Sequence, residues 1–193
     1  AYLGAACRRC SGCLKHKKRL WIARAYHETL LSFRTWFGTL TFPPAIHSQA
    51  IARCLERAWD DGLSYSNMTE SEQHAVEAAV LYALVDKFFK RLRKKYRFRY
   101  LCVAEPHESG LIHFHLLIHE TTPDQIPKRI LEEQWATGLS HWRLVNTGDK
   151  RAVFYVCKYL SKEPDMRPRA SLHYGSPIKC DPRRGSGSIA PGD

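Results

Sequence analysis

Two apolar runs joined by a short polar turn constrain this chain more than any other feature. The first run spans Phe98–Glu105 and the second spans Ile112–Glu120. Bulky apolar residues in runs of this length are typical of strands. Pro106 and Gly110 lie between the runs and favour a turn. The sequence therefore predicts a β-hairpin.

His113 and His115 lie in the second run with one phenylalanine between them. Because side chains alternate on a strand, both imidazoles are expected on one face of the sheet. Neutral imidazole is a common metal ligand, and the hairpin would bring the Glu105 carboxylate beside the pair. Two nitrogens and one oxygen with open positions suit a catalytic divalent ion, Mg²⁺ or Mn²⁺. Glu108 and His107 on the turn are alternatives to Glu105, and a polar strand face without metal is the alternative to the whole site.

A second group of candidate residues lies in Lys150–Lys162, where apolar residues recur at spacings of three and four and predict a helix. Tyr155 and Tyr159 are four residues apart, so both hydroxyls are expected on one helix face. Lys158 and Lys162 repeat the same spacing beside them. A tyrosine can act as a covalent nucleophile, and nearby cations favour its phenolate. The alternative is a packed amphipathic helix with tyrosines at its rim and solvated lysines.

Together these segments resemble the HUH endonucleases, which are named after a histidine–hydrophobic–histidine motif such as His113–His115. Phe37–Phe42 is similar to the family's first strand motif, and the order of strand, histidine pair and tyrosine helix agrees. The likeness extends to dual-tyrosine replication initiators of single-stranded-DNA bacteriophages, the gene A type of microviruses. Their tyrosine helix is similar to Tyr155–Lys162, and a Glu-Pro-His such as Glu105–His107 often precedes their histidines. Cys7–Cys13, followed by a basic helix, also resembles initiators of smaller microviruses.

The resemblance implies an RNA-recognition-motif-like palm and an enzyme that nicks one DNA strand at a replication origin. One tyrosine would attack in line, leaving a 3′-hydroxyl primer and a transient 5′-phosphotyrosine bond. The second tyrosine would act after a round of rolling-circle synthesis. The implied partners are a single-stranded origin hairpin and a host helicase and polymerase, in the cytoplasm of a bacterial host. A dual-tyrosine transposase or a conjugative relaxase uses the same chemistry and is an alternative.

The composition agrees with a nucleic-acid partner. Lys and Arg number 30 against 19 Asp and Glu, which gives a formal charge of +11 and favours a polyanion. Five cations between residues 90 and 95 are expected either to bind phosphates or to form a solvated helix end: Lys90, Arg91, Arg93, Lys94 and Lys95. A non-catalytic single-strand binder would explain the charge, but not the joint spacing of the histidine and tyrosine pairs. No apolar run approaches the roughly 20 residues of a membrane span.

The chain has 7 cysteines and no recognisable secretory signal, which favours a reducing cytoplasm over a disulfide framework. Cys7, Cys10 and Cys13 are separated by two residues each, and the same spacing continues to His16. Thiolates and imidazole suit Zn²⁺, so these four residues are a candidate Cys₃His site, although such close spacing makes a cramped loop. Cys180 is an alternative fourth ligand. A metal-free loop leading into a basic helix is the alternative structure.

Periodicity elsewhere predicts helices at residues 14–31, 48–59, 67–96 and 126–136, and strands at residues 35–42 and 141–145. Thr69 is expected to cap the third of these helices together with Glu72, and Pro127 to lie in the first turn of the fourth. The chain suits one core, and an α+β fold with a central antiparallel sheet follows, with helices on the face opposite the histidine pair. We expect residues 1–165 to form the endonuclease domain with its cysteine-containing extension. The Pro-, Gly-, Arg- and Ser-rich residues 166–193 are expected to form a flexible tail.

Overall fold

The computed structural model describes residues 7–107, 109–162 and 164–176, and only the backbone of Tyr159. Predictions about Glu108, Cys180 and residues 177–193 therefore lie outside the described residues. The elements in chain order are α1 (Ser11–Leu31), β1 (Arg34–Leu40), α2 (Pro44–Asp60), η1 (Tyr65–Asn67), α3 (Glu70–Arg93), β2 (Phe98–Pro106), β3 (Ile112–Glu120), α4 (Lys128–Gln134), β4 (Ser140–Val145), α5 (Lys150–Cys157), η2 (Lys158–Ser161) and β5 (Arg169–Ala170).

The strands form one antiparallel sheet in the order β4-β1-β3-β2-β5. The predicted hairpin is confirmed, because β2 and β3 pair along their whole length, from Phe98 opposite Glu120 to Pro106 opposite Ile112. The α+β fold class with a central antiparallel sheet is confirmed as well. β3 lies in the middle of the sheet, so its histidines have strands on both sides.

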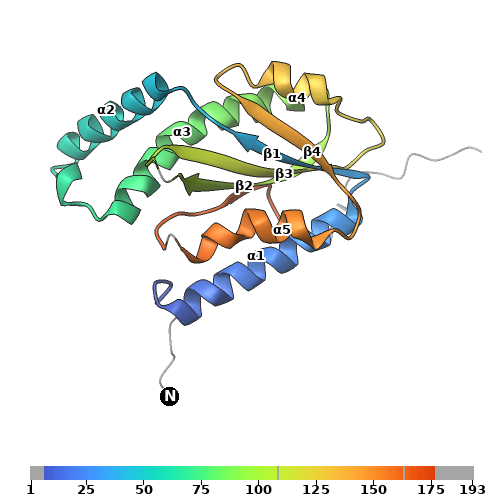
Figure 1. The fold of residues 1–193 in the computed structure, drawn as a ribbon, viewed down its shortest axis with the longest axis horizontal. Coiled ribbons are helices and arrows are strands. Elements are labelled where there is room, and N and C mark those ends of the chain that lie inside the picture. Colours follow the sequence, from blue (N-terminus) through green and yellow to red (C-terminus); the bar gives the residue numbers. More distant parts are fainter. Residues whose placement is uncertain (1–6, 108, 163, 177–193) are drawn as a thin grey trace, which may run out of the picture.

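Helices cover both faces of this sheet: α2, α3 and α4 lie on one side, and α1 and α5 on the other (Figure 1). Phe114 and Leu116 of β3 belong to the core under α3, whereas Leu117 belongs to a second core with Val153 and Val156 of α5. The histidines share the Leu117 face by alternation. The prediction of helices only opposite the histidine pair is therefore wrong, because α1 and α5 carry apolar stripes that are buried on the histidine face.

The helix boundaries follow from local chemistry. Thr69 caps α3 as predicted: its side chain accepts a hydrogen bond from the Glu72 amide at 3.4 Å, and the Glu72 carboxylate accepts one from the Thr69 amide at 3.0 Å. Pro127 is the residue before α4 rather than part of its first turn. Within the described ranges, no helix is both long and apolar enough to cross a membrane.

A buried carboxylate fixes one end of the central strands. Glu120, the last residue of β3, is fully buried and accepts two hydrogen bonds from the Arg34 guanidinium at 2.9 and 3.0 Å. It also accepts from Trp36 Nε1 at 3.0 Å and from the Ile126 amide at 2.9 Å. A buried charge is tolerated only when it is paired and hydrogen-bonded in this way. The network fixes the register of β1 against β3.

The flexible tail predicted for residues 166–193 is wrong in its first part. β5 pairs with β2, with Ala170 opposite Leu101. The Tyr174 hydroxyl lies 2.7 Å from Nε2 of buried His119, whose Nδ1 lies 3.0 Å from the Thr35 hydroxyl. A two-residue strand is too short to produce a periodic pattern, and a single buried tyrosine gives no sequence signal of docking.

Candidate active site

Three predicted ligands lie together where β2 ends and β3 begins. Glu105 is directly opposite His113 in the antiparallel register, and His115 is opposite Val103 one step further along. The Glu105 carboxylate pairs with Nε2 of His115, diagonally across the two strands. The hairpin therefore brings one carboxylate and both imidazoles to one end of the sheet, on the face that α5 covers.

His115 is held by β1 as well as by Glu105. Its Nδ1 lies 3.1 Å from the Thr39 hydroxyl, and its ring stacks on Phe37 with 5.9 Å between centroids. A hydrogen-bond partner on the second ring nitrogen fixes the orientation of a ligating histidine and the position of its proton. Thr39 and Phe37 thus position His115, a role that the sequence did not indicate although both lie in the first strand motif.

His113 is less enclosed and has an open nitrogen. Its Nε2 is buried and has no hydrogen-bond partner among the residues that the structure describes. Its ring lies 5.0 Å from the ring of His107. Burial lowers the pKa of His113, and the neighbouring imidazoles of His115 and His107 lower it further. A neutral imidazole with an open nitrogen can bind a cation, so the donor set fits a divalent metal.

These three ligands do not yet form a closed cluster. In the described part of the chain, the only three His, Cys, Asp or Glu side chains whose ligand atoms all lie within 4.8 Å of one another are cysteines. A shared ion would therefore require the His113 side chain to approach the Glu105–His115 pair. The site is a set of neighbouring donors that an ion would have to draw closer together.

Tyr155 is the candidate nucleophile whose side chain the structure describes. It lies on α5, which begins where the Asp149 carboxylate accepts a hydrogen bond from the Arg151 amide at 2.8 Å. The Tyr155 ring meets the His115 ring edge-on, with 5.2 Å between centroids. Nζ of Lys158 lies 4.5 Å from the Tyr155 ring centre. Tyr155 is 40% exposed, so a DNA strand can reach it.

The predicted tyrosine helix is wrong in its last part. The α-helix ends at Cys157, and Lys158–Ser161 form the 3₁₀ helix η2, as often happens at the C-terminus of an α-helix. The Tyr159 backbone lies in η2, and the expectation that its hydroxyl shares a face with Tyr155 concerns a side chain outside the described set. Lys162 follows η2 and is exposed.

Two residues of β4 also belong to this face, and sequence reasoning missed both. Arg143 is opposite Phe37 in the register, and its guanidinium lies 4.9 Å from the Phe37 ring centre. His141 is opposite Thr39 and is exposed. The available signal was alternation along the predicted strand 141–145, which puts its odd-numbered residues on one face.

The cations expected to bind DNA lie at the other end of the sheet. Residues 90–95 form the end of α3 and lead into β2 at Phe98, whereas Glu105 lies seven residues further along that strand, about 23 Å away at 3.3 Å per residue. Lys94 and Lys95 are exposed there. Phosphates bound at this cluster would therefore be distant from Tyr155.

Several of these cations have partners within the fold. Nζ of Lys90 lies 2.7 Å from the Asp86 carboxylate, and Arg91 donates a hydrogen bond to the Gln134 carbonyl. The Arg93 guanidinium lies 5.3 Å from the centres of two aromatic rings on β2. These contacts support a structural contribution of the cluster, beside any binding of phosphates.

A second candidate metal site lies where α1 begins. The Sγ atoms of Cys7, Cys10 and Cys13 form the cluster within 4.8 Å described above. Sγ of Cys7 lies 3.7 Å from Sγ of Cys13 and accepts a hydrogen bond from the Cys10 amide at 3.2 Å. Backbone hydrogen bonds from Cys10 and then Arg9 lower the pKa of Cys7 to about 7, which favours its thiolate at neutral pH. The cluster can therefore hold a metal ion, and the predicted fourth ligand, His16, lines the same cavity.

Comparison with known families gives one match. A family model of replication-associated proteins, the ORF2 type, matches residues 35–164, about two thirds of the chain, from β1 through the tyrosine segment. No curated protein and no solved structure matches. The matched segment contains the hairpin, Glu105, both histidines and Tyr155, while the cysteine cluster and β5 lie outside it. The chain therefore belongs to this ORF2-type family of replication-associated proteins, as a DNA-binding protein with a role in the initiation of replication.

Proposed function

We propose that the protein nicks and rejoins single-stranded DNA at a replication origin through a 5′-phosphotyrosine intermediate, and so initiates rolling-circle replication. The observation that carries this proposal is the position of Tyr155, whose ring is 5.2 Å from His115 on the sheet face that also holds His113 and Glu105. A non-catalytic binder has no need for a half-exposed tyrosine beside a histidine–carboxylate pair.

Glu105, His113 and His115 would hold the divalent ion, Mg²⁺ or Mn²⁺. When bound, such an ion polarises the scissile phosphate as a Lewis acid. The open Nε2 of His113 and the carboxylate already paired with His115 are the features that fit this role. Thr39 would keep His115 oriented throughout. The thiol cluster suits a softer ion, and we assign Zn²⁺ to it, apart from the reaction.

Tyr155 would attack the phosphorus in line with the leaving 3′ oxygen. A bond forms from the phenolic oxygen to phosphorus and the bond to the 3′ oxygen breaks; the phenol loses its proton and the leaving oxygen gains one. The DNA then ends in a 3′-hydroxyl, and its 5′-phosphate is esterified to the protein. The Lys158 ammonium beside the Tyr155 ring favours the phenolate, and Lys162 is a further candidate for binding phosphate.

Tyr159 would be the second nucleophile. Its backbone follows Tyr155 by one turn, and attack by its hydroxyl on the first phosphotyrosine would pass the strand from one phenol to the other. The phosphoester is conserved in this exchange, so the strand can be rejoined without an external energy source. The same reaction serves dual-tyrosine transposases and conjugative relaxases, and the DNA substrate distinguishes these roles.

The DNA partner we propose is a single-stranded origin hairpin, with a host helicase and polymerase acting next in the cytoplasm of a bacterial host. The charge of +11 implies that affinity falls steeply between low and physiological salt through release of counterions. Arg143, over the Phe37 ring on the active-site face, is placed to bind the strand near Tyr155. Affinity that does not change with salt would contradict a phosphate-dominated interface.

The decisive experiment incubates the protein with labelled single-stranded origin hairpins and Mg²⁺ or Mn²⁺, followed by a denaturing gel. We expect DNA attached through its 5′ end to Tyr155 or Tyr159, and no adduct in the double change Tyr155→Phe with Tyr159→Phe. His113→Ala with His115→Ala should abolish cleavage and preserve most of the DNA affinity.

Tyr26→Phe is a matched control for the tyrosine variants, because Tyr26 also has a lysine over its ring, Lys150 at 4.9 Å, and should be dispensable. A product with a free 5′-phosphate would overturn the covalent mechanism. Binding without cleavage in either metal would indicate a single-strand binder instead.

A further inference from the structure

The cysteine loop before α1 has the dimensions of a zinc site. In a tetrahedral site with Zn–S bonds of about 2.3 Å, two sulfurs lie about 3.8 Å apart. The distance between Sγ of Cys7 and Sγ of Cys13 is 3.7 Å, and Cys10 completes a set within 4.8 Å. A disulfide would require about 2.05 Å. The spacing therefore fits three thiolates around one ion.

The backbone of the loop supports the same arrangement. Arg8 adopts a left-handed conformation with φ of 63°, which turns the chain between Cys7 and Cys10. This turn points the Cys10 amide at Sγ of Cys7, at 3.2 Å. An amide that donates to a sulfur stabilises the thiolate form, which is the form that binds metal. The loop is thus arranged around its sulfurs before any ion is bound.

His16 is the best placed fourth ligand. It follows Cys13 by one turn of α1, so the two side chains lie on the same side of the helix. Cys7, Cys13 and His16 line one cavity of about 700 Å³. Asp165 lines it too, but its carboxylate is already paired with Arg9 at 2.8 Å.

We propose that Cys7, Cys10, Cys13 and His16 hold one structural Zn²⁺, and that this ion fastens the loop before α1 to the segment that follows the tyrosines. The ion has no part in the chemistry at His113 and Tyr155. The proposal goes beyond the nicking function and does not depend on it, because the cluster lies outside residues 35–164, the part that matches the family.

Two side chains connect the proposed zinc site to the rest of the fold. Arg9, inside the cysteine loop, pairs with Asp165 at 2.8 Å and with Glu72 in the first turn of α3 at 3.5 Å. Lys17, one residue after His16, donates a hydrogen bond to the Met166 carbonyl at 2.8 Å. Immobilising the loop would therefore immobilise residues 165 and 166.

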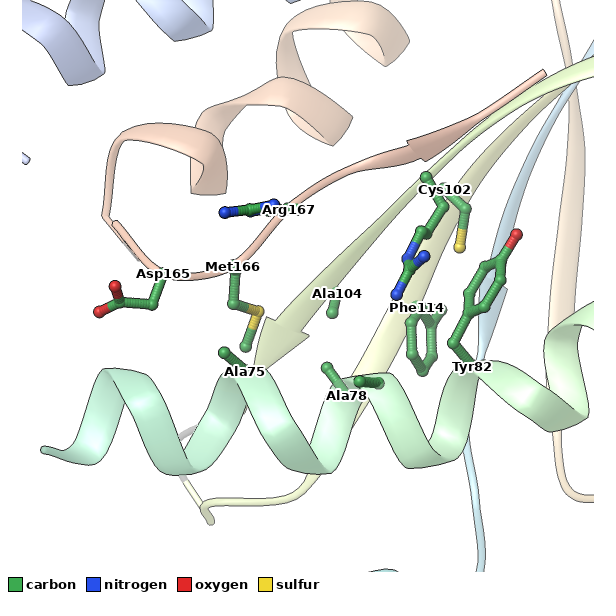
Figure 2. Close-up of a pocket in the computed structure, with 11 residues that line it drawn as sticks. Ala75, Ala78, Tyr82, Cys102, Ala104, Phe114, Asp165, Met166 and Arg167 are labelled. Atoms are coloured by element: carbon green, nitrogen blue, oxygen red, sulfur yellow. The ribbon is translucent and has the colours of Figure 1, made fainter. Parts of the chain in front are cut away.

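Residues 165–167 also close a small cavity of about 200 Å³ between α3 and β2, where Asp165, Met166 and Arg167 lie across from Ala75 and Ala78 (Figure 2). The same segment connects η2 to β5, and α1 packs against both α5 and η2. An ion at the start of α1 would thus stabilise the support on which Tyr155 and η2 rest.

The first test measures metal in the full-length chain purified under reducing conditions. We expect one Zn²⁺ per chain, and after exchange with Co²⁺ the absorption of a tetrahedral site with sulfur-to-cobalt charge-transfer bands. Cys10→Ser should abolish these bands, and His16→Ala should weaken metal binding at least about tenfold, the lower end for loss of one group that supports a metal. His16→Cys should restore binding with stronger charge transfer.

Cys180→Ser is the matched control, because Cys180 is the alternative fourth ligand. Metal lost in Cys180→Ser and retained in His16→Ala would overturn the assignment of His16. A chain that binds no Zn²⁺, or that forms a disulfide between Cys7 and Cys13 under reducing conditions, would overturn the site itself.

The second test follows hydrogen exchange of the backbone amides by mass spectrometry, before and after removal of zinc with a chelator. Exchange should become faster in residues 7–17 and 165–170 and remain unchanged in β1 and β3. Arg9→Gln should keep the metal and still accelerate exchange at residues 165–170, because it removes only the connection. Unchanged exchange in that segment after zinc removal would refute the fastening role while leaving the metal site intact.

Discussion

Lowering the pH from 7 to 5 should cost this protein about 2 kcal/mol of unfolding free energy through one buried histidine. His119 lies on β3, is fully buried, and is held between the Thr35 hydroxyl at 3.0 Å and the Tyr174 hydroxyl at 2.7 Å. Burial, and then the positive charge of Arg99, lowers the pKa of His119 from 6.5 to about 3. The imidazole therefore stays neutral in the folded protein at pH 5.

The sign and size follow from proton linkage. In the unfolded chain His119 has its ordinary pKa near 6.5, so at pH 5 the unfolded state binds a proton that the folded state excludes. This stabilises the unfolded state by about 0.2 kcal/mol at pH 7 and about 2 kcal/mol at pH 5, and the loss continues as the pH falls towards 3. The stabilisation is thus fully present above the unfolded pKa and is lost below it.

Urea unfolding at both pH values measures this loss, and the His119→Gln variant isolates it. Burial also lowers the pKa of His47 and His113, so the wild type alone would report a sum. His119→Gln should lose about 2 kcal/mol less than the wild type between pH 7 and 5, whereas the exposed control His141→Gln should behave as the wild type. Equal losses in the wild type and in His119→Gln would mean that His119 is not buried as a neutral group under Tyr174.

Three further substitutions test other parts of the structure. Thr39→Val removes the hydroxyl 3.1 Å from Nδ1 of His115 and should lower the cleavage rate about 10- to 100-fold with little change in DNA affinity, measured in single-turnover and binding assays; an unchanged rate would exclude the positioning role. Glu120→Ala leaves Arg34 without its buried partner and should lower the unfolding free energy by about 3–5 kcal/mol in urea titrations, whereas a loss below about 1 kcal/mol would contradict the network. Gly38→Ala places a Cβ 2.2 Å from the Trp142 ring and should cost about 1–3 kcal/mol in the same assay; neutrality would show that β4 packs differently.

The fold was predictable wherever a long run carried one period. The hairpin, the capping box at Thr69 and the apolar stripe of α3 were all predictable from the sequence, because each is a local pattern of residue types. The docking of residues 169–176 was not, because it depends on a single hydrogen bond to His119 and a two-residue strand pair. Likewise, coverage of both sheet faces depends on where α1 packs, and no local pattern records that.

The candidate site divides in the same way. Alternation on β3 and the antiparallel register placed Glu105 and the two histidines together, as expected from spacing alone. Spacing could not predict that the α-helix ends at Cys157, so the geometry expected for Tyr159 from a continuous helix does not transfer. It also could not rank the cations: Lys90–Lys95 is the densest cluster in the sequence, yet the cations near Tyr155 are Lys158 and Arg143, which come from separate elements.

The first strand motif has a separate physical role for each of three consecutive residues. Phe37 stacks on His115, and Thr39, two residues on and therefore on the same face, holds Nδ1 of that histidine. Gly38 points to the other face, where a Cβ would lie 2.2 Å from the Trp142 ring, so only glycine lets β4 lie close there. That close approach places Arg143, next to Trp142 and on the opposite face, over Phe37. A short Phe-Gly-Thr in the middle of a sheet thus connects the packing of one face to the orientation of the histidine on the other.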